Sequence, residues 1–442
     1  MPKQKSTAKA SVNSSAKTIG KTSANTSAKT SVKASVKKPT KAKANNPADP
    51  SVKAVPNAHA KPTASQPVKP SGKPSGKNSG SISAASGADR VFMEAAFAEA
   101  RKVKGKTLPN PPVGAVLVKA GKAVGKGGTR PAGQAHAEIV ALEMAGTHAR
   151  GSTLYVTLEP CSHHGRTPPC VDAIIAAGVA KVVIAIRDAN PLVGGKGIAA
   201  LRKAGIDVRI GLMEEEAADL YSGFFFRILH GRPRIILKIA QTLDGRINRM
   251  SGEEITITGE ESRAWVHGLR SRVDAVLIGG RTLRGDNPQL TPRLIKGATV
   301  PEAVVLSRKG PFSESAYLFA RGREAKTIVV GETRQGLPEW VEHVPTKEFA
   351  EKSDILAVLL DLFIRKGYHS VLVEGGSELW ALFLNAGLWD SLFILTAPAV
   401  FTQGDRWDAG LGQDWGKSLK FRKLSPFGSD FLAEFGRSES DG

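Results

Sequence analysis

Residues 157–170 read TLEPCSHHGRTPPC, and residues 136–138 upstream read HAE. His136, Cys161 and Cys170 are side chains of the kinds that zinc prefers in proteins. Three protein ligands leave the fourth tetrahedral position open for water, as in catalytic rather than structural zinc sites. These two stretches therefore predict a catalytic zinc site, and they predict that the chain folds so as to bring the three side chains together.

Glu138 is the group expected to handle the protons of the zinc water. His-x-Glu followed by Pro-Cys is the pattern of zinc-dependent nucleobase deaminases, in which the glutamate is general acid and base and not a ligand. A structural disulfide between Cys161 and Cys170, the two cysteines of the chain, is the plain alternative. A lone disulfide would not require His-Ala-Glu upstream, and so few cysteines are typical of a reducing compartment. We therefore expect zinc rather than a disulfide.

Two helix starts are expected to hold the zinc between them. Residues two apart do not share a face of a regular helix, so His136 and Glu138 can converge on one metal only where a helix begins. Pro168 and Pro169 predict a second helix start at Cys170, because proline is tolerated at the first helical position. Unpaired N–H groups at such a start stabilise a thiolate.

A lysine-rich N-terminal segment carries most of the net charge of +21. Residues 1–87 hold 16 Lys against one acidic residue, a net +15, and they contain no aromatic side chain. Such a segment cannot bury enough apolar surface to offset chain entropy, so we expect it to be disordered and to contribute to no active site. Its lysines favour solubility or weak, salt-sensitive attraction to anionic surfaces. Neither a membrane span nor a signal peptide is predicted.

The rest of the chain is expected to form two α/β domains, at residues 88–230 and 231–442, because strand-like and helix-like segments alternate in both. In the first domain we expect strands at 114–118, 153–158, 182–186 and 208–210, and helices at 93–103, 198–204 and 214–229. In the second we expect strands at 235–239, 275–278, 303–306, 327–330, 371–374 and 392–395, and helices at 261–270, 355–365 and 379–386.

Two glycine pairs in the second domain follow expected strands. Gly279-Gly280 precedes Arg281-Thr282, and Gly375-Gly376 precedes another expected helix. Glycine lets backbone approach a ligand closely, and a helix start offers N–H groups to phosphate. The alternative to phosphate binding is that the glycine pairs form two tight strand-to-helix turns that bind no ligand. There is no Gly-x-Gly-x-x-Gly after the first strand, so the domain is not an obvious Rossmann domain.

The first domain resembles the deaminase half of the bifunctional deaminase–reductase family of riboflavin biosynthesis. The resemblance rests on residues 157–170, whose eight-residue spacer between the cysteines differs from the Cys-x-x-Cys of most cytidine and nucleic-acid deaminases. Asn110-Pro111, Val113-Gly114 and Asp188-x-Asn190-Pro191 resemble the same family. The resemblance makes Glu138 the catalytic residue. Candidates to hold the substrate are Asn110, His163 and Arg166.

The second domain resembles the reductase half of that family. The motifs are Lys238 through Leu243-Asp244-Gly245-Arg246, His267-x-Leu269-Arg270, the stretch 286–293 and Val373-Glu374-Gly375-Gly376. By position, the resemblance places cofactor contacts at Ala240, Thr256, Thr282 and Asp286. It places substrate contacts at Glu254, Arg270, Leu290, Arg293 and Glu374. Arg270 and Arg293 together suit phosphate, because guanidinium groups bind oxygens bidentately.

The resemblance implies a cytidine-deaminase-like three-layer domain followed by a dihydrofolate-reductase-like domain. It implies one zinc ion per chain and NADPH as the reductase cofactor. Arg281 is expected to bind the 2′-phosphate of NADPH. The implied activities are deamination of 2,5-diamino-6-ribosylamino-4(3H)-pyrimidinone 5′-phosphate and reduction of 5-amino-6-(5-phosphoribosylamino)uracil. The expected partners are these small phosphorylated pyrimidines and further copies of the chain, with no membrane and no specific nucleic acid. The expected location is the cytoplasm.

Four residues depart from the family pattern: Thr256 replaces a tryptophan, Glu254 a serine, and Thr129 and Leu108 each a histidine. Thr256 and Glu254 motivate one alternative, a deaminase whose reductase domain is degenerate. The other is a deaminase of tRNA or another nucleic acid that uses the lysine-rich tail to bind the backbone. The long cysteine spacer and the second domain argue against this second alternative.

Overall fold

The structure is a computed structural model that describes residues 87–437 except 166, 191–192, 250–255, 322–325, 347–351 and 413. The expectations for residues 1–86, Arg166 and Glu254 therefore lie outside the described residues. Within the described residues, no helix is both long and apolar enough to cross a membrane.

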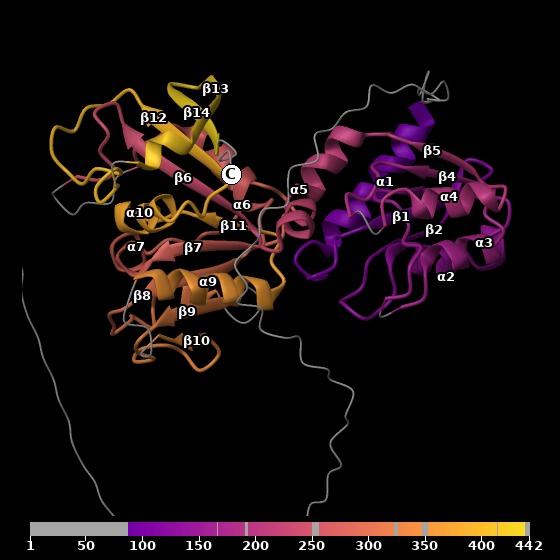
Figure 1. Cartoon of the computed structure of the whole chain (residues 1–442), viewed down its shortest axis with the longest axis horizontal. Coiled ribbons are helices and arrows are strands. Elements are labelled where there is room, and N and C mark those ends of the chain that lie inside the picture. Colours follow the sequence, from indigo (N-terminus) through magenta and orange to yellow (C-terminus); the bar gives the residue numbers. More distant parts are fainter. Residues whose placement is uncertain are drawn as a thin grey trace, which may run out of the picture. The chain divides into compact units, whose positions relative to one another are not determined.

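A five-stranded sheet forms the centre of the first domain, with the strand order β2-β1-β3-β4-β5 (Figure 1). Strand β1 pairs antiparallel with β2 and β3, whereas β3, β4 and β5 run parallel. The strands are β1 (Gly114–Lys119), β2 (Lys122–Gly128), β3 (Thr153–Val156), β4 (Lys181–Ile184) and β5 (Asp207–Ile210). The helices are α1 (Gly87–Val103), α2 (Ala137–Ala145), α3 (Cys170–Ala176), α4 (Lys196–Lys203) and α5 (Glu214–His230), with a 3-10 turn η1 (Gly146–Ala149).

Glycines in the sheet set how closely the helices pack on it. A Cβ on Gly125 of β2 would lie 2.2 Å from the carbonyl oxygen of Ala141 in α2, so that helix rests on the bare backbone. A Cβ on Gly128 would instead meet α1, 2.9 Å from the carbonyl oxygen of Glu99. Because odd and even residues of a strand face opposite sides, α1 and α2 cover opposite faces of the sheet. The first domain is therefore built in three layers, as expected.

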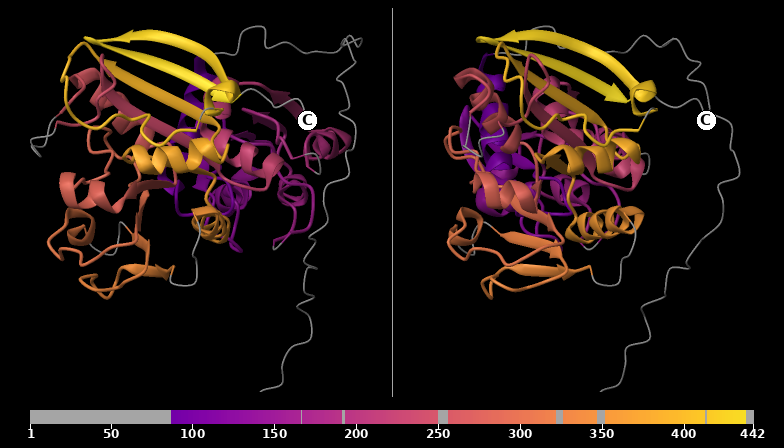
Figure 2. Two further views of the ribbon diagram at one scale, coloured as in Figure 1. Left: turned by 60° about the vertical axis from the view of Figure 1, so that its left-hand side comes forward. Right: turned by 90° about the vertical axis from the view of Figure 1, so that its left-hand side faces the viewer.

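A nine-stranded sheet forms the second domain, in the order β10-β9-β8-β7-β11-β6-β12-β14-β13. All neighbours are parallel except those made by the C-terminal hairpin, β13 and β14, which extends the sheet beyond β12 (Figure 2). The first strands are β6 (Arg234–Thr242), β7 (Ala275–Gly279), β8 (Glu302–Ser307), β9 (Thr327–Gly331) and β10 (Glu342–Pro345). The others are β11 (Ser370–Val373), β12 (Ser391–Ala397), β13 (Leu419–Phe427) and β14 (Asp430–Arg437).

Helices cover both faces of this second sheet. Ile235 and Leu237 of β6 belong to one apolar cluster with Phe383, whereas Ile236 between them belongs to another with Leu269. The helices are α6 (Glu260–Arg270), α7 (Gly280–Asp286), α8 (Tyr317–Ala320), α9 (Lys352–Lys366) and α10 (Ser377–Asn385), with a 3-10 turn η2 (Trp415–Ser418). Strands buried on both faces explain the near-continuous apolar runs in the sequence.

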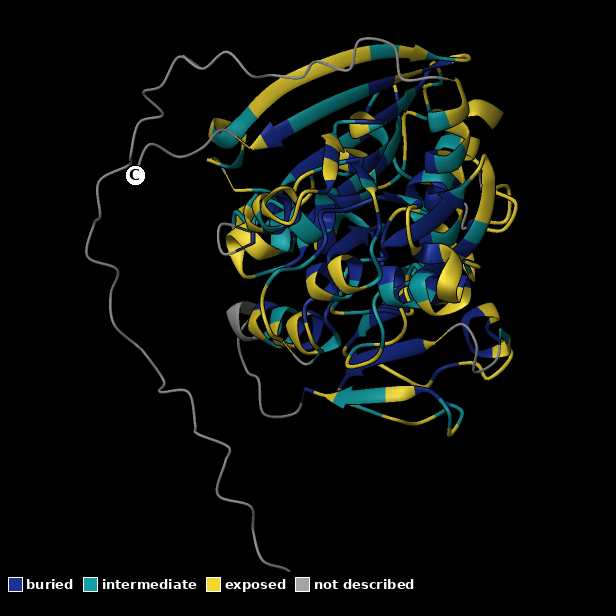
Figure 3. Ribbon diagram, turned by 90° about the vertical axis from the view of Figure 1, so that its right-hand side faces the viewer, coloured by how far each residue is buried: buried dark blue, intermediate teal, exposed yellow. Residues whose placement is uncertain are grey.

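The sequence expectations missed five elements. Strand β2 was missed because its sequence, KAVGKGG, lacks the β-branched and aromatic residues that mark strands. Strand β13 was missed because most of its residues face solvent and its sequence, LKFRKLSPF, is interrupted by cations and a proline. The exposed strand β13 contrasts with the buried central strands in Figure 3. The other missed elements are β14 and the short α8 and β10.

Gly114→Ala is expected to destabilise the first domain. The new Cβ would lie 1.9 Å from the carbonyl oxygen of Ala96 in α1, so the backbone of helix or strand must move. Overpacking of this kind costs about 1–3 kcal/mol. Gly268→Ala in α6 is the matched control, since nothing lies within 4 Å of its Cβ position. Thermal unfolding of both variants checks this, and equal melting temperatures would contradict it.

Candidate active sites

The three expected zinc ligands meet at two helix starts, as predicted. His136 immediately precedes α2 in an extended conformation, and Cys170 is the first residue of α3, directly after Pro169. The Nδ1 atom of His136 lies 3.3 Å from Sγ of Cys170 and 3.6 Å from Sγ of Cys161. All three ligand atoms lie within 4.8 Å of one another.

The donor set and its spacing fit zinc. Zn–S and Zn–N bonds of about 2.3 and 2.0 Å place two ligands of a tetrahedron roughly 3.5 Å apart, which is the spacing seen here. The backbone N–H of Cys170 donates to Sγ of Cys161 over 3.3 Å. Hydrogen bonds from the side chain of Cys170 and from His136 help to lower the pKa of Cys161 to about 4, so Cys161 is a thiolate. Thiolate is the form of cysteine that binds metal.

Glu138 lies in the first turn of α2 with only 3% of its surface exposed. Burial, followed by repulsion from the Cys161 thiolate, raises the pKa of Glu138 to about 7. A carboxyl group with a pKa near neutrality can both accept and return a proton. Residues 136–138 thus place a ligand and a proton carrier at one helix start.

The loop that bears Asn110 is tied down by short-range bonds. The N–H of Asn110 donates to the carbonyl of Thr107, whose hydroxyl donates back to the carbonyl of Asn110. Thr129, at a position where the family has histidine, is buried and accepts the backbone N–H of Val113. This bond ties the end of β2 to the start of β1. His163 is exposed in the loop between the cysteines.

The two glycine turns of the second domain lie side by side. Strands β7 and β11 are parallel neighbours in which Leu277 pairs with Val373, and the N–H of Glu374 donates to the carbonyl of Leu277. Gly279 directly precedes α7, and Gly376 directly precedes α10. Both helix starts therefore lie at the carboxyl edge of one sheet, which is where open parallel sheets bind ligands.

Arg270 and Glu374 are paired with each other in the structure. Nε and one terminal nitrogen of Arg270 donate to the two carboxylate oxygens of Glu374, at 2.6 and 2.9 Å. Both side chains are largely buried. The expectation that Arg270 offers its guanidinium fork to phosphate is therefore altered, because Glu374 already occupies that fork. Arg293, the second expected phosphate ligand, is exposed.

Lys238 and His267 belong to the sequence motifs of the second domain, but no role was predicted for either. Nζ of Lys238 lies 3.9 Å from the Glu374 carboxylate, and burial lowers the pKa of Lys238. His267 accepts the N–H of Leu294 at Nδ1. Burial, with the charges of Arg270 and Arg293, lowers the pKa of His267 to about 4, so it is neutral. Lys238, a cation, and His267, a neutral hydrogen-bond donor, stand in motifs beside expected substrate residues, and a role at the site could have been predicted from this.

The remaining expected contacts are Leu290 for the substrate and Ala240, Thr256, Thr282 and Asp286 for the cofactor. Leu290 is buried and has a φ of 53°, a conformation that is uncommon for a leucine. Ala240 is half-buried on β6, Thr282 is half-buried and Asp286 is exposed on α7, and Thr256 is exposed in the segment before α6.

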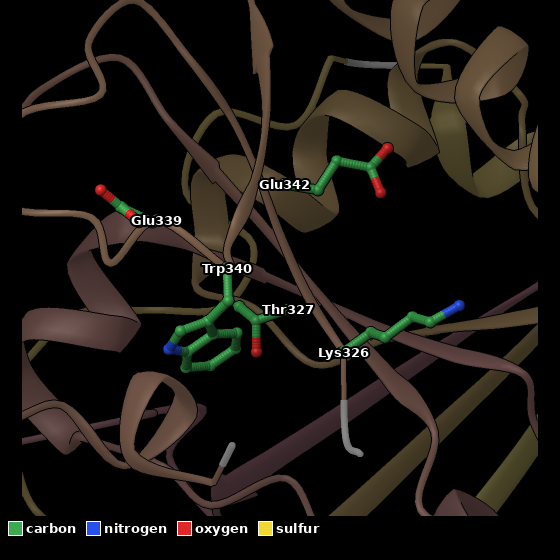
Figure 4. Close-up of a pocket in the computed structure, with 5 residues that line it drawn as sticks. All are labelled: Lys326, Thr327, Glu339, Trp340 and Glu342. Atoms are coloured by element: carbon green, nitrogen blue, oxygen red, sulfur yellow. The ribbon is translucent and has the colours of Figure 1, made fainter. Parts of the chain in front are cut away.

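A separate pocket lies beside β9 and β10 (Figure 4). It is lined by Lys326, Thr327, Glu339, Trp340 and Glu342. None of these is an expected site residue, and the glycine turns follow other strands, so this pocket is not the expected nucleotide site.

The comparisons with known proteins cover both domains. Residues 86–186 match the cytidine and deoxycytidylate deaminase zinc-binding region, and residues 233–433 match the RibD C-terminal domain. The first match covers the domain that holds the zinc ligands, and the second covers the domain that holds the two glycine turns.

Whole-chain relatives carry the same two halves. The riboflavin biosynthesis protein RibD of Aquifex aeolicus is 41% identical over 79% of this chain and 98% of that protein. RibD of Synechocystis is 44% identical over 71% of this chain and 85% of its own length. A crystal structure from Thermotoga maritima, described as a diaminohydroxyphosphoribosylaminopyrimidine deaminase/5-amino-6-(5-phosphoribosylamino)uracil reductase, is 37% identical with a TM-score of 0.63. It covers 79% of this chain and 98% of that one.

A match that runs through both halves favours the riboflavin enzyme over a nucleic-acid deaminase. It also agrees with the zinc-ligand geometry and with the paired glycine turns. The chain therefore belongs to the RibD family of riboflavin biosynthesis, bifunctional enzymes that join a zinc-dependent deaminase to an NADPH-dependent reductase.

Proposed function

We propose that this chain deaminates 2,5-diamino-6-ribosylamino-4(3H)-pyrimidinone 5′-phosphate and then reduces the deaminated product, 5-amino-6-(5-phosphoribosylamino)uracil, to its ribityl form. The observation that carries the proposal is the cluster of His136, Cys161 and Cys170 beside the buried Glu138. Three ligands leave a position open, and a proton carrier stands next to it.

Each residue of the deaminase site has a distinct task. His136, Cys161 and Cys170 would hold zinc, which when bound lowers the pKa of water so that a nucleophile exists near neutral pH. Glu138 would accept a proton from the water and return it to the leaving ammonia, a task that suits a buried carboxyl group whose pKa burial raises. Asn110, His163 and Arg166 hold the pyrimidine phosphate.

The reductase site supplies orientation and charge. The two glycine turns and the start of α7 would hold the phosphates of NADPH, which supplies the hydride when bound. Ala240, Thr256, Thr282 and Asp286 would contact the cofactor. Lys238 and Arg270, both paired with Glu374, would offer positive charge to the substrate, and Arg293 would bind its phosphate. Glu254 and Leu290 are the other proposed substrate contacts.

We further propose that the deaminase domain spans residues 88–230 and the reductase domain spans residues 231–442. Two thiol ligands that must stay reduced support a location in the cytoplasm.

Cys161→Ser and Cys170→Ser should each strip or weaken zinc binding. A hydroxyl is a poor substitute for a thiolate as a zinc ligand. Metal analysis after gel filtration of the full chain should show about one zinc per wild-type chain and clearly less in each variant. A wild-type protein with an intramolecular disulfide and little zinc would show that the site is wrongly assigned.

Glu138→Gln should keep zinc but lower deamination by at least about 100-fold, because a positioned acid–base group contributes roughly that much. Reduction of the already deaminated substrate should continue at the wild-type rate. Glu143→Gln, an exposed glutamate on the same helix, is the matched control. Near-normal deamination by the Glu138 variant would refute the proposed proton carrier.

Arg281→Ala should narrow the preference for NADPH over NADH by about tenfold, the effect of one lost charged contact with phosphate. Arg281 is exposed at the start of α7 and lies 2.7 Å from Glu378, so a 2′-phosphate must compete with that carboxylate. Arg365→Ala is the control, since Arg365 is also exposed and paired with a carboxylate. The measurement is kcat/KM for NADPH and for NADH. If the ratio of these two values does not change, Arg281 does not bind the 2′-phosphate.

We also propose that the chain forms a homo-oligomer through the C-terminal hairpin. Strand β13 is the edge of the sheet, and Phe421 and Leu424 on it are 60% and 59% exposed. Exposed apolar residues on an open edge are typical of an interface. Replacing both by serine should shift the wild-type oligomer to single chains in light scattering, whereas Met144→Ser, also exposed, should not. A monomeric wild-type protein would contradict this.

A further inference from the structure

Residues 104–109 lead from α1 to the expected substrate residue Asn110, and they lie against the reductase half of the chain. Nζ of Lys104 donates to the carbonyl of Ser271 over 2.8 Å. The half-buried Leu108 packs against the apolar cluster formed by β6, β11, α9 and α10. An apolar side chain at position 108, where the family has histidine, suits this packing. The loop that bears Asn110 is thus docked on the reductase half.

The turn at residues 367–369, between α9 and β11, contacts the residue directly before Asn110. Gly367 has a φ of 75°, a conformation that favours glycine, and a Cβ there would lie 3.0 Å from Cβ of Pro109. Nε2 of His369 lies 2.8 Å from the carbonyl oxygen of Pro109. The turn therefore supplies both a close packing surface and a polar contact to this proline.

His369 is the donor in this contact. Only 6% of its surface is exposed, and burial lowers its pKa, so the ring is neutral and carries a single N–H. A carbonyl oxygen only accepts, which places that N–H on Nε2. The ring also meets Phe224 of α5 edge to face, with the two centroids 5.4 Å apart. Its surroundings therefore hold the imidazole in place.

The backbone of His369 is fixed as well. Its N–H donates to the carboxylate of the buried Asp274 over 2.7 Å. Its carbonyl accepts the N–H of Arg234 at the start of β6, at 2.9 Å. A Cβ on Gly223 of α5 would lie 3.1 Å from the same carbonyl oxygen, so this helix packs closely on the turn. His369 is therefore a rigid donor and not a surface side chain that finds the loop by chance.

The other side of Asn110 is held within the deaminase half. The hydroxyl of the buried Tyr221 donates to the carbonyl of Pro112 over 3.2 Å and lies 2.6 Å from the hydroxyl of Thr157. Thr157 begins the stretch that leads to the expected zinc ligand Cys161. One end of the loop is thus anchored beside the zinc site, and the other end is anchored on the reductase half.

We propose that the turn at residues 367–369 positions the substrate loop of the deaminase: His369 and Gly367 hold Pro109 and so set where Asn110 meets the pyrimidine. The inference rests on the proposed function, in which Asn110 holds that substrate. In this role His369 is a positioning residue that acts through Pro109. Deamination then depends on the reductase half, although it consumes no NADPH.

A role limited to holding the two halves of the chain together is the competing explanation. The two explanations differ in what they predict for the kinetics. A purely structural contact affects the melting temperature and both activities alike. A contact that positions Asn110 affects KM for deamination and leaves reduction of the already deaminated substrate unchanged.

His369→Phe in the full-length, zinc-loaded chain separates them. The phenyl ring can keep the contact with Phe224 but has no N–H to donate. We expect KM for the diaminopyrimidine phosphate to rise about fivefold, the effect of one lost hydrogen bond, with a smaller change in kcat. His369→Gln, whose amide can still donate, should restore most of the wild-type KM. Zinc per chain and reductase kinetics should stay at wild-type values in both variants.

His343→Phe is the matched control, because Nε2 of His343 also bonds a backbone carbonyl, that of Gly331 at 3.1 Å, but on β10 and β9. Hydrogen exchange adds a readout that needs no substrate. The N–H of Asn110, which donates to the carbonyl of Thr107, should exchange faster in His369→Phe than in the control.

Each outcome decides the inference. An unchanged KM in His369→Phe would overturn it, and so would a parallel fall in both activities or a failure of His369→Gln to restore KM. If His369→Phe does not fold, Leu108→Ala decides, because it weakens the same docking and leaves His369 in place. A raised KM for deamination alone then supports the proposal, and an unchanged KM overturns it. Failure of the wild type and of His343→Phe to release ammonia would instead refute the proposed function.

Discussion

Buried negative charge is the constraint on which the deaminase half depends. Cys161, Cys170 and Glu138 lie together with little access to water, and the negative charges of the Cys161 thiolate and the Glu138 carboxylate repel each other. Helix starts at His136 and Cys170 offset part of that repulsion with their unpaired N–H groups. A zinc ion held by the three ligands would offset the rest. Metal binding, the protonation of Glu138 and the stability of this region are therefore coupled.

Close packing of helices on bare backbone brings these helix starts together. Gly114, Gly125 and Gly128 let α1 and α2 rest directly on the first sheet, which fixes where α2 begins. Glu159 ties the other side of the site to α4 through backbone bonds. In the second domain, Gly280 plays a similar part, since a Cβ there would lie 2.0 Å from the hydroxyl oxygen of Ser307. Both sites are thus positioned by small residues and backbone contacts.

The sequence predicted the elements with strong apolar patterns and the sites with dense motifs. The zinc ligands, both helix starts and both glycine turns could be read from spacing, because each requires a particular residue at a particular position. Strand β13 could not, since its exposed residues show no apolar period. The pairing of Arg270 with Glu374 could not be read either, because it joins side chains 104 residues apart in the chain. The bonds from the backbone of Asp188, Gly195 and Ile198 to Glu159 could not be predicted either, because they also join residues far apart in the chain.

The central claim is that one chain performs deamination first and reduction second. Its most direct test is incubation of the purified, zinc-loaded chain with the diaminopyrimidine phosphate, with and without NADPH, while both products and ammonia are measured. Without NADPH, ammonia and 5-amino-6-(5-phosphoribosylamino)uracil should accumulate; with NADPH, the ribityl product should replace the uracil as the cofactor is oxidised. Oxidation of NADPH without release of ammonia, or no release of ammonia under either condition, would contradict the account.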